Sequence, residues 1–155
     1  KLGFSDRFAL HTGELADTRF LENLRMEASP VQLVMANPPW RLVGSGRLPA
    51  TEARRKALFG DKGTFPLFTS AASSLLEEDG RFACIISPDR LQDWAGLTPY
   101  LLQYIHKQKT SPATFVLIEA RKGAHAKPSV AEPIALYGPE RFFTLESLAF
   151  CPFLR

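Results

Sequence analysis

The chain has 155 residues, enough for one domain with a core of its own, and its formal net charge at pH 7 is +3. Hydrophobic residues make up 45% and charged residues 23%, which excludes a disordered or fibrous class. No stretch holds the roughly eighteen uncharged apolar residues of a membrane-spanning helix, and the first residues lack the apolar run of a signal peptide, so we expect a cytoplasmic location.

The first part of the chain predicts a strand, a helix and a second strand. Residues 8–13 have strand character and stop at a glycine, and residues 18–26 carry apolar side chains at helical spacing. Residues 31–36 form an apolar run that ends at Asn-Pro-Pro. Proline lacks a backbone donor and biases the preceding residue away from the helix, so the strand must end there, with Asn37 at its carboxyl end.

A basic loop, a helix and a buried strand are expected next. Residues 41–63 contain glycines, a proline and many basic side chains, which predicts a long loop with one short helix near 52–58. Residues 64–76 predict an amphipathic helix. Residues 81–87 are a nearly continuous apolar run of the kind buried on both faces of a parallel sheet, so Cys84 should be a buried, inert thiol.

The last part predicts a helix over 97–106, strands over 114–120 and 132–137, and a short helix or turn over 144–150. The alternation of strands and helices favours an α/β fold with a mostly parallel sheet. Its last two strands are joined by a short connection and should be antiparallel.

Only two cysteines are present, Cys84 and Cys151. They are far apart and belong to no CxxC or Cys/His cluster, so we expect neither a disulfide framework nor a metal site.

The segment with the strongest chemical signal is Asn37-Pro38-Pro39-Trp40. It follows a strand at its carboxyl end, where open α/β sheets bind their ligands. The Asn37 side-chain oxygen and the Pro38 carbonyl could accept the hydrogens of an exocyclic amine and stabilise the charge that develops when a methyl group arrives. Trp40 offers a flat face for a base taken out of its stack. The alternative is that the prolines only end the strand and Trp40 packs in the core.

The motif is similar to the target-amine motif of amino-methyltransferases, and the resemblance extends along the chain. The stretch from Phe65 to Ser87, followed by Pro88-Asp89-Arg90-Leu91, looks like the family segment that comes next. Residues 112–123 resemble a strand of the bacterial tRNA adenine-N6 methyltransferases that modify position 37 of a valine tRNA. Phe143-Thr144-Leu145-Glu146 is compatible with the tail of that family.

This resemblance implies a class I, Rossmann-like methyltransferase sheet with an antiparallel final strand pair and S-adenosylmethionine as cofactor. Such enzymes bind the cofactor on a glycine-rich loop after their first strand, and the sequence contains no such loop. Residues 1–155 are therefore expected to be a single incomplete domain, from the third strand onward, inactive alone and prone to self-association through an exposed apolar edge. Glu14 follows Gly13 where the family has a Gly-Asp pair on the adenine of the cofactor, and is the cofactor-binding candidate.

Basic residues are concentrated after the motif. Six of them stand against two acidic residues over residues 41–62, and we assign them to nucleic-acid binding: Arg41, Arg47, Arg54, Arg55, Lys56 and Lys62. A merely solvated loop is the alternative.

Three functions are compatible with the sequence. The first is S-adenosylmethionine-dependent N6-adenine methylation of nucleic acid, with tRNA favoured and DNA possible. The second is methylation of another amine, either guanine N2 of rRNA or a protein glutamine. The third is a non-catalytic nucleic-acid-binding module.

Overall fold

The computed structural model describes residues 8–28, 31–39, 41–42, 48–123, 127–140 and 142–151. Two predicted site residues, Trp40 and Arg47, lie outside the described residues.

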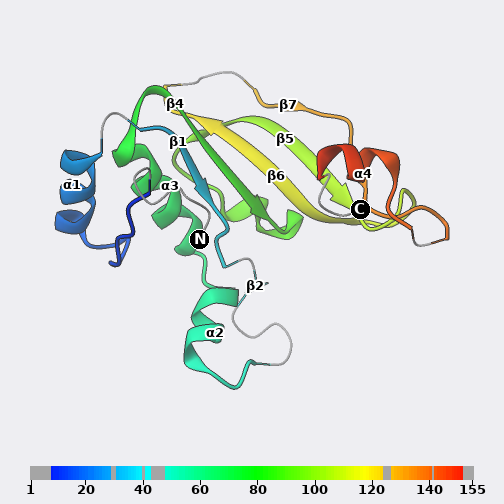
Figure 1. Cartoon of the computed structure of the whole chain (residues 1–155), viewed down its shortest axis with the longest axis horizontal. Coiled ribbons are helices and arrows are strands. Elements are labelled where there is room, and N and C mark those ends of the chain that lie inside the picture. The colour runs from blue at the N-terminus through cyan, green and yellow to red at the C-terminus, as the bar shows by residue number, and fades with distance from the viewer. Residues whose placement is uncertain are drawn as a thin grey trace.

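A six-stranded mixed sheet forms the body of the molecule (Figure 1). Its strands are β1 (Val31–Ala36), β4 (Leu76–Ile86), β5 (Thr98–His106), β6 (Ala113–Arg121), β7 (Ser129–Val130) and β8 (Ile134–Ala135). The order is β1-β4-β6-β5-β7, and β8 also pairs with β5. β1 is parallel to β4, β7 and β8 are parallel to β5, and β6 is antiparallel to both of its neighbours. All strands of this sheet thus point the same way except β6, which confirms the predicted α/β class with a mixed sheet.

Helices cover one face of the sheet at the β1–β4 end. α3 (Thr64–Leu75) connects β1 to β4 and packs on both strands, and α1 (Thr18–Glu27) packs on α3. Asp17 caps α1, because its carboxylate accepts hydrogen bonds from the first-turn amides of Arg19 and Phe20. The bounds of both helices lie within one residue of the prediction.

A short arm leaves the sheet directly after β1 (Figure 1). It contains β2 (Arg41–Leu42), α2 (Glu52–Leu58) and β3 (Phe59–Gly60). β2 and β3 pair in parallel as a separate two-stranded sheet. At the other end of the molecule, α4 (Leu145–Phe150) packs on β8. A 3₁₀ helix, η2 (Pro88–Asp93), follows directly after β4.

The core lies between the sheet and α3. Strand alternation turns six buried side chains toward it, Phe82, Cys84, Ile86, Val116, Ile118 and Ala120, and α3 contributes Phe65 and Ala72. Cys84 is therefore buried, as predicted. The opposite face carries Ala83, Ile85 and Leu117 half-buried, and at its β1 margin Leu33 and Met35 are 43% and 75% exposed. Self-association through an exposed apolar edge stays a prediction.

Residues 98–106 form strand β5, so the prediction of a helix over 97–106 is wrong. β5 and β6 are the two arms of an antiparallel hairpin whose turn is held by hydrogen bonds between Gln108 and Ser111. Leu102 and Tyr104 alternate toward the core, while the half-buried Leu101 and Gln103 face the other way. Because apolar residues occur on both faces, the period of two was hidden in the sequence.

Two further expectations fail. Residues 8–13 form no strand: Phe8 and Leu10 are 72% and 82% exposed, and the segment joins no ladder in the described part of the chain. The predicted strand over 132–137 is reduced to β8 and one isolated bridge, and it pairs in parallel with β5. The antiparallel pair was expected between the strands over 114–120 and 132–137, but β6 is antiparallel to β5 and β8 pairs with β5 in parallel.

None of the helices in the described residues is long and apolar enough to cross a bilayer. The same residues contain no cluster of three or more His, Cys, Asp or Glu side chains that could hold a metal ion.

Candidate active site at the carboxyl edge of the sheet

The Asn-Pro-Pro segment lies where the sequence predicts it. β1 ends at Ala36, which is paired with Cys84 of β4, so the carboxyl ends of two parallel strands lie side by side. Asn37 is exposed at this edge, and Pro38 is buried below it. The segment thus presents one amide side chain to solvent from a backbone that two prolines and the burial of Pro38 hold in place.

The far end of this segment is held by the arm. Arg41 pairs with Phe59 and Leu42 with Gly60, so the chain is fixed again directly after residue 40. Gly60 is also buried against the motif. A Cβ atom at position 60 would lie 3.0 Å from the carbonyl oxygen of Pro39 and 2.5 Å from Oγ1 of Thr64. Only glycine permits this approach of the two backbones.

A hollow of about 730 Å³ opens beside the motif. It brings together three residues that the sequence singles out, Glu14, Pro39 and Lys56, with the start of α3 at Thr64. Its volume lies in the range of small-molecule sites, roughly 300–1,000 Å³. The sequence-predicted cofactor residue and the sequence-predicted catalytic loop therefore border one space.

The rim of this hollow carries groups that could hold part of a cofactor. Glu14 is exposed at the rim, where its carboxylate can accept hydrogen bonds from hydroxyl or amino groups. Gly13 allows α1 to approach closely, since a Cβ atom there would lie 2.5 Å from the ring of Phe20.

The described basic residues lie on the arm and at the rim of the hollow. The side chains of Arg54, Arg55 and Lys56 are exposed on α2, and Lys62 is exposed in the turn before α3. Arg41 is exposed at the start of β2. The ion pair between Lys56 and Glu52 spans 3.5 Å, and both side chains are more than 70% exposed, so solvent screens it and leaves Lys56 able to bind phosphate.

Asn37 also borders the open face of the sheet. A second hollow of about 590 Å³ lies there, lined by Met35, Ala83, Ile85 and Leu117 beside Asn37. The exposed amide of Asn37 thus lies between the apolar hollow on the open face of the sheet and the arm formed by β2, α2 and β3.

Sequence reasoning missed Arg90, a residue of η2 on the same edge. Its side chain is fully buried and donates from Nε to Asp93 at 2.7 Å and from Nη2 to the carbonyl oxygen of Asp61 at 2.6 Å. Its guanidinium carbon lies 4.5 Å from the centroid of the Phe65 ring. The only available signal was its position just after a buried strand, and no local pattern marks a partner 29 residues away.

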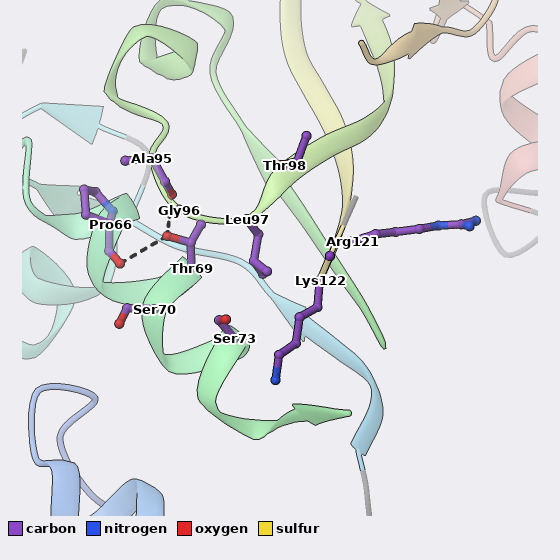
Figure 2. A pocket seen from close by; sticks show the side chains of 11 residues that line it. Pro66, Thr69, Ser70, Ser73, Ala95, Gly96, Leu97, Thr98, Arg121 and Lys122 are labelled. Carbon is purple, nitrogen blue, oxygen red and sulfur yellow. Dashed lines mark hydrogen bonds between the residues drawn. The ribbon is translucent and has the colours of Figure 1, made fainter. Parts of the chain in front are cut away.

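A further hollow, of about 400 Å³, lies at the opposite edge of the sheet, where β5 begins and β6 ends (Figure 2). Two of its polar side chains, Thr69 and Lys122, are already hydrogen-bonded within the fold. The Thr69 hydroxyl bonds the carbonyls of Pro66 and Ala95, and Lys122 donates to the Leu76 carbonyl at 2.8 Å. Figure 2 shows Arg121 extending away from this hollow. It does not contain the motif, and the carboxyl edge remains the candidate site.

Comparison with known proteins identifies the fold. No protein-family model and no curated protein matches the chain. The structure resembles the crystal structure of a predicted O-methyltransferase, protein Atu636 from Agrobacterium tumefaciens, with a TM-score of 0.58 and 21% sequence identity. The match covers 84% of this chain and 55% of that protein, so the chain spans about half the length of its structural neighbour. At this identity the likeness concerns the fold alone: the chain has a methyltransferase-like α/β fold with a mixed six-stranded sheet.

Proposed function

We propose that this chain is the acceptor-binding part of an S-adenosylmethionine-dependent N6-adenine methyltransferase that acts on nucleic acid, with tRNA favoured over DNA. The observation that carries the proposal is the exposed Asn37 amide on a fixed Asn-Pro-Pro backbone at the carboxyl end of β1. Fold likeness to a methyltransferase supports the reaction class. The choice of adenine and of tRNA rests on the resemblance of the sequence motifs.

The chemistry requires that the amine become nucleophilic, because its lone pair is delocalised into the ring. The Asn37 side-chain oxygen and the Pro38 carbonyl would accept its two hydrogens and favour a pyramidal nitrogen. Their positions are set before the base arrives, since Pro38 is buried and the residues after the motif are paired, so little reorganisation is needed. No titrating base is required at the start, because the proton leaves after transfer.

The cofactor would supply the electrophilic methyl group, and Glu14 would hold its nucleoside end. The exposed cations Arg41, Arg54, Arg55 and Lys62 would contact backbone phosphates and release counterions. Lys56 belongs to this set and also lines the hollow with Glu14. The roles of Glu14 and of the cations can be tested separately by mutation.

The test is methyl transfer by the full-length protein to unmodified tRNA, to a DNA oligonucleotide and to a glutamine-containing peptide. Asn37→Ala should lower kcat by about 10²–10³, the effect of removing one such polar group from a transition state, and leave the Kd for tRNA within about threefold. Gln92→Ala, which removes an exposed amide on η2, is the control and should leave kcat unchanged.

Three outcomes count against the proposal. Equal kcat of Asn37→Ala and wild type would refute the role of Asn37. Transfer to the peptide or to guanine N2 in place of adenine would replace the substrate. Tight tRNA binding without transfer to any acceptor would leave a non-catalytic nucleic-acid-binding module.

A further inference from the structure

We infer that Arg90 is a positioning residue for the Asn37 loop: its buried guanidinium ties the arm to the end of β4 and so fixes where the loop stands. The effect on methyl transfer rests on the proposed function. The effect on the loop itself does not.

The contacts of Arg90 join segments that are distant in sequence. Within η2 it pairs with Asp93, whose side chain is only 8% exposed. Across the fold it donates to the backbone carbonyl of Asp61, the residue directly after β3. The ring of Phe65, in the first turn of α3, lies against the guanidinium plane. Arg90 therefore holds the junction between β3 and α3 at the point where β4 ends.

The position of the Asn-Pro-Pro motif depends on this junction between β3 and α3. β3 pairs with β2, and β2 starts directly after residue 40. The other limb of the motif is held by β1, whose last residue, Ala36, pairs with Cys84 of β4. Strand pairing of β1 with β4 therefore holds the N-terminal side of the motif. On its C-terminal side, the motif is held through β2, β3 and the hydrogen bond from Arg90. Arg90 adds a direct hydrogen bond from η2 to the residue after β3, beside the packing of α3 on β1 and β4.

The energetics favour a geometric role over a stabilising one. Burial of a guanidinium and a carboxylate is costly, and a hydrophobic pair of similar size often packs as well. In the described residues, Nη1 of Arg90 is buried without a hydrogen-bond partner, which adds to that cost. What a hydrophobic side chain cannot supply is a directed hydrogen bond to the Asp61 carbonyl. Fixed position is therefore what Arg90 provides.

The experiment uses three variants of the full-length protein. Arg90→Met with Asp93→Leu removes both charges together, so that no buried carboxylate is left without a partner. Arg90→Lys keeps the charge and one donor direction but loses the planar fork. Arg121→Met is the matched control, since this arginine also pairs with a carboxylate, Glu119, and lies 3.8 Å from an aromatic ring centroid, at the opposite edge of the sheet.

Hydrogen exchange of backbone amides is the first measurement. In the double variant, amides over residues 59–64 and at residues 37 and 40–42 should exchange at least about tenfold faster, while amides of β6 keep their wild-type rates. Arg90→Lys should fall between the double variant and wild type, and Arg121→Met should leave both segments unchanged. Unaltered exchange over 59–64 and 37–42 in the double variant would overturn the inference.

Steady-state kinetics is the second measurement. kcat should fall about 10- to 100-fold with KM for RNA within about threefold, and Arg90→Lys should recover part of kcat. A uniform rise of exchange that includes β6 would make Arg90 a general stabilising residue and would also overturn the inference. If the double variant does not fold, Arg90→Lys decides by the same two readouts. Faster loop exchange in a protein whose wild type transfers no methyl group would sink the proposed function and leave this inference standing.

Discussion

Replacing Gly60 by alanine should displace the Asn37 loop. The added Cβ atom would lie 2.5 Å from Oγ1 of Thr64 and 3.0 Å from the carbonyl oxygen of Pro39. The first contact can be relieved by rotation of the Thr64 side chain, at the expense of its 3.2 Å hydrogen bond to Asp61. The second is with backbone, so the Pro39 carbonyl must move by a few tenths of an ångström.

The size of the effect follows from these contacts. Overpacking of a buried position costs about 1–3 kcal/mol, and for a chain of this length each kcal/mol lowers Tm by roughly 2–4 °C. We therefore expect a fall of about 2–12 °C in Tm. A displacement of about 1 Å at a reacting group can cost 10²-fold in rate, so a few tenths of an ångström should lower kcat about three- to tenfold.

Two further variants separate stability from position. Gly63→Ala is the matched control, because the nearest atom to its new Cβ lies at 3.4 Å, at the edge of ordinary contact. Adding Thr64→Ala to Gly60→Ala removes the hydroxyl contact but keeps the contact with Pro39. The double variant should recover much of the lost Tm and little of the lost kcat, measured by thermal unfolding and methyl transfer. If Gly60→Ala matched Gly63→Ala in both, the close approach of β3 to the motif would be wrong.

Three other outcomes are expected. Replacing Arg54, Arg55 and Lys56 by glutamine should reduce the slope of the logarithm of the tRNA association constant against the logarithm of salt concentration by about 2–3. Glutamine at Lys107 and Lys109, which are exposed on the β5–β6 turn, should leave this slope unchanged. If the α2 variant had the same slope as wild type, α2 would not be part of the interface. Burial raises the pKa of Cys84 from 9.0 to about 12, so above pH 9 the unfolded chain loses this proton first, and the free energy of unfolding should fall with rising pH toward pH 12. Urea titrations at about pH 8 and pH 10 should show a smaller fall for Cys84→Ala than for wild type, and the same fall would contradict the assignment. Lys122→Met should cost about 0.5–1.5 kcal/mol through the lost hydrogen bond to the Leu76 carbonyl, with exposed Lys127→Met as the unaffected comparison; identical Tm values would show the bond contributes nothing.

The features that the sequence predicts correctly depend on local physics. The end of β1 follows from the covalent geometry of Pro38 and Pro39, and this alone places Asn37 at the carboxyl edge. The short helix over 52–58 has the bounds that its composition indicates. The apolar run at 81–87 is a strand as predicted, but only Phe82, Cys84 and Ile86 are buried, because helices cover one face of the sheet and Ala83 and Ile85 lie half-buried on the other.

The failures arise from contacts between distant segments. β5 is a strand because β6 pairs with it on one side and the short β7 and β8 on the other. This pairing outweighs the local helical spacing of its leucines. Residues 8–13 have the composition of a strand, but no neighbouring strand pairs with them in the described structure. Arg90 and Asp61 meet across 29 positions, and nothing in either local sequence marks the pair.

The parallel pairing of β2 with β3 also has an evolutionary consequence. Because Arg41 stands beside Phe59, the intervening chain leaves the fold and returns to it at adjacent points, about one strand spacing apart. A segment between two such adjacent points can change in length and sequence while its two ends stay where they are. The part of the molecule that carries the exposed cations of α2 can therefore change without disturbing the Asn-Pro-Pro geometry. Under the proposed function, a different segment between residues 42 and 59 would provide contacts to a different acceptor.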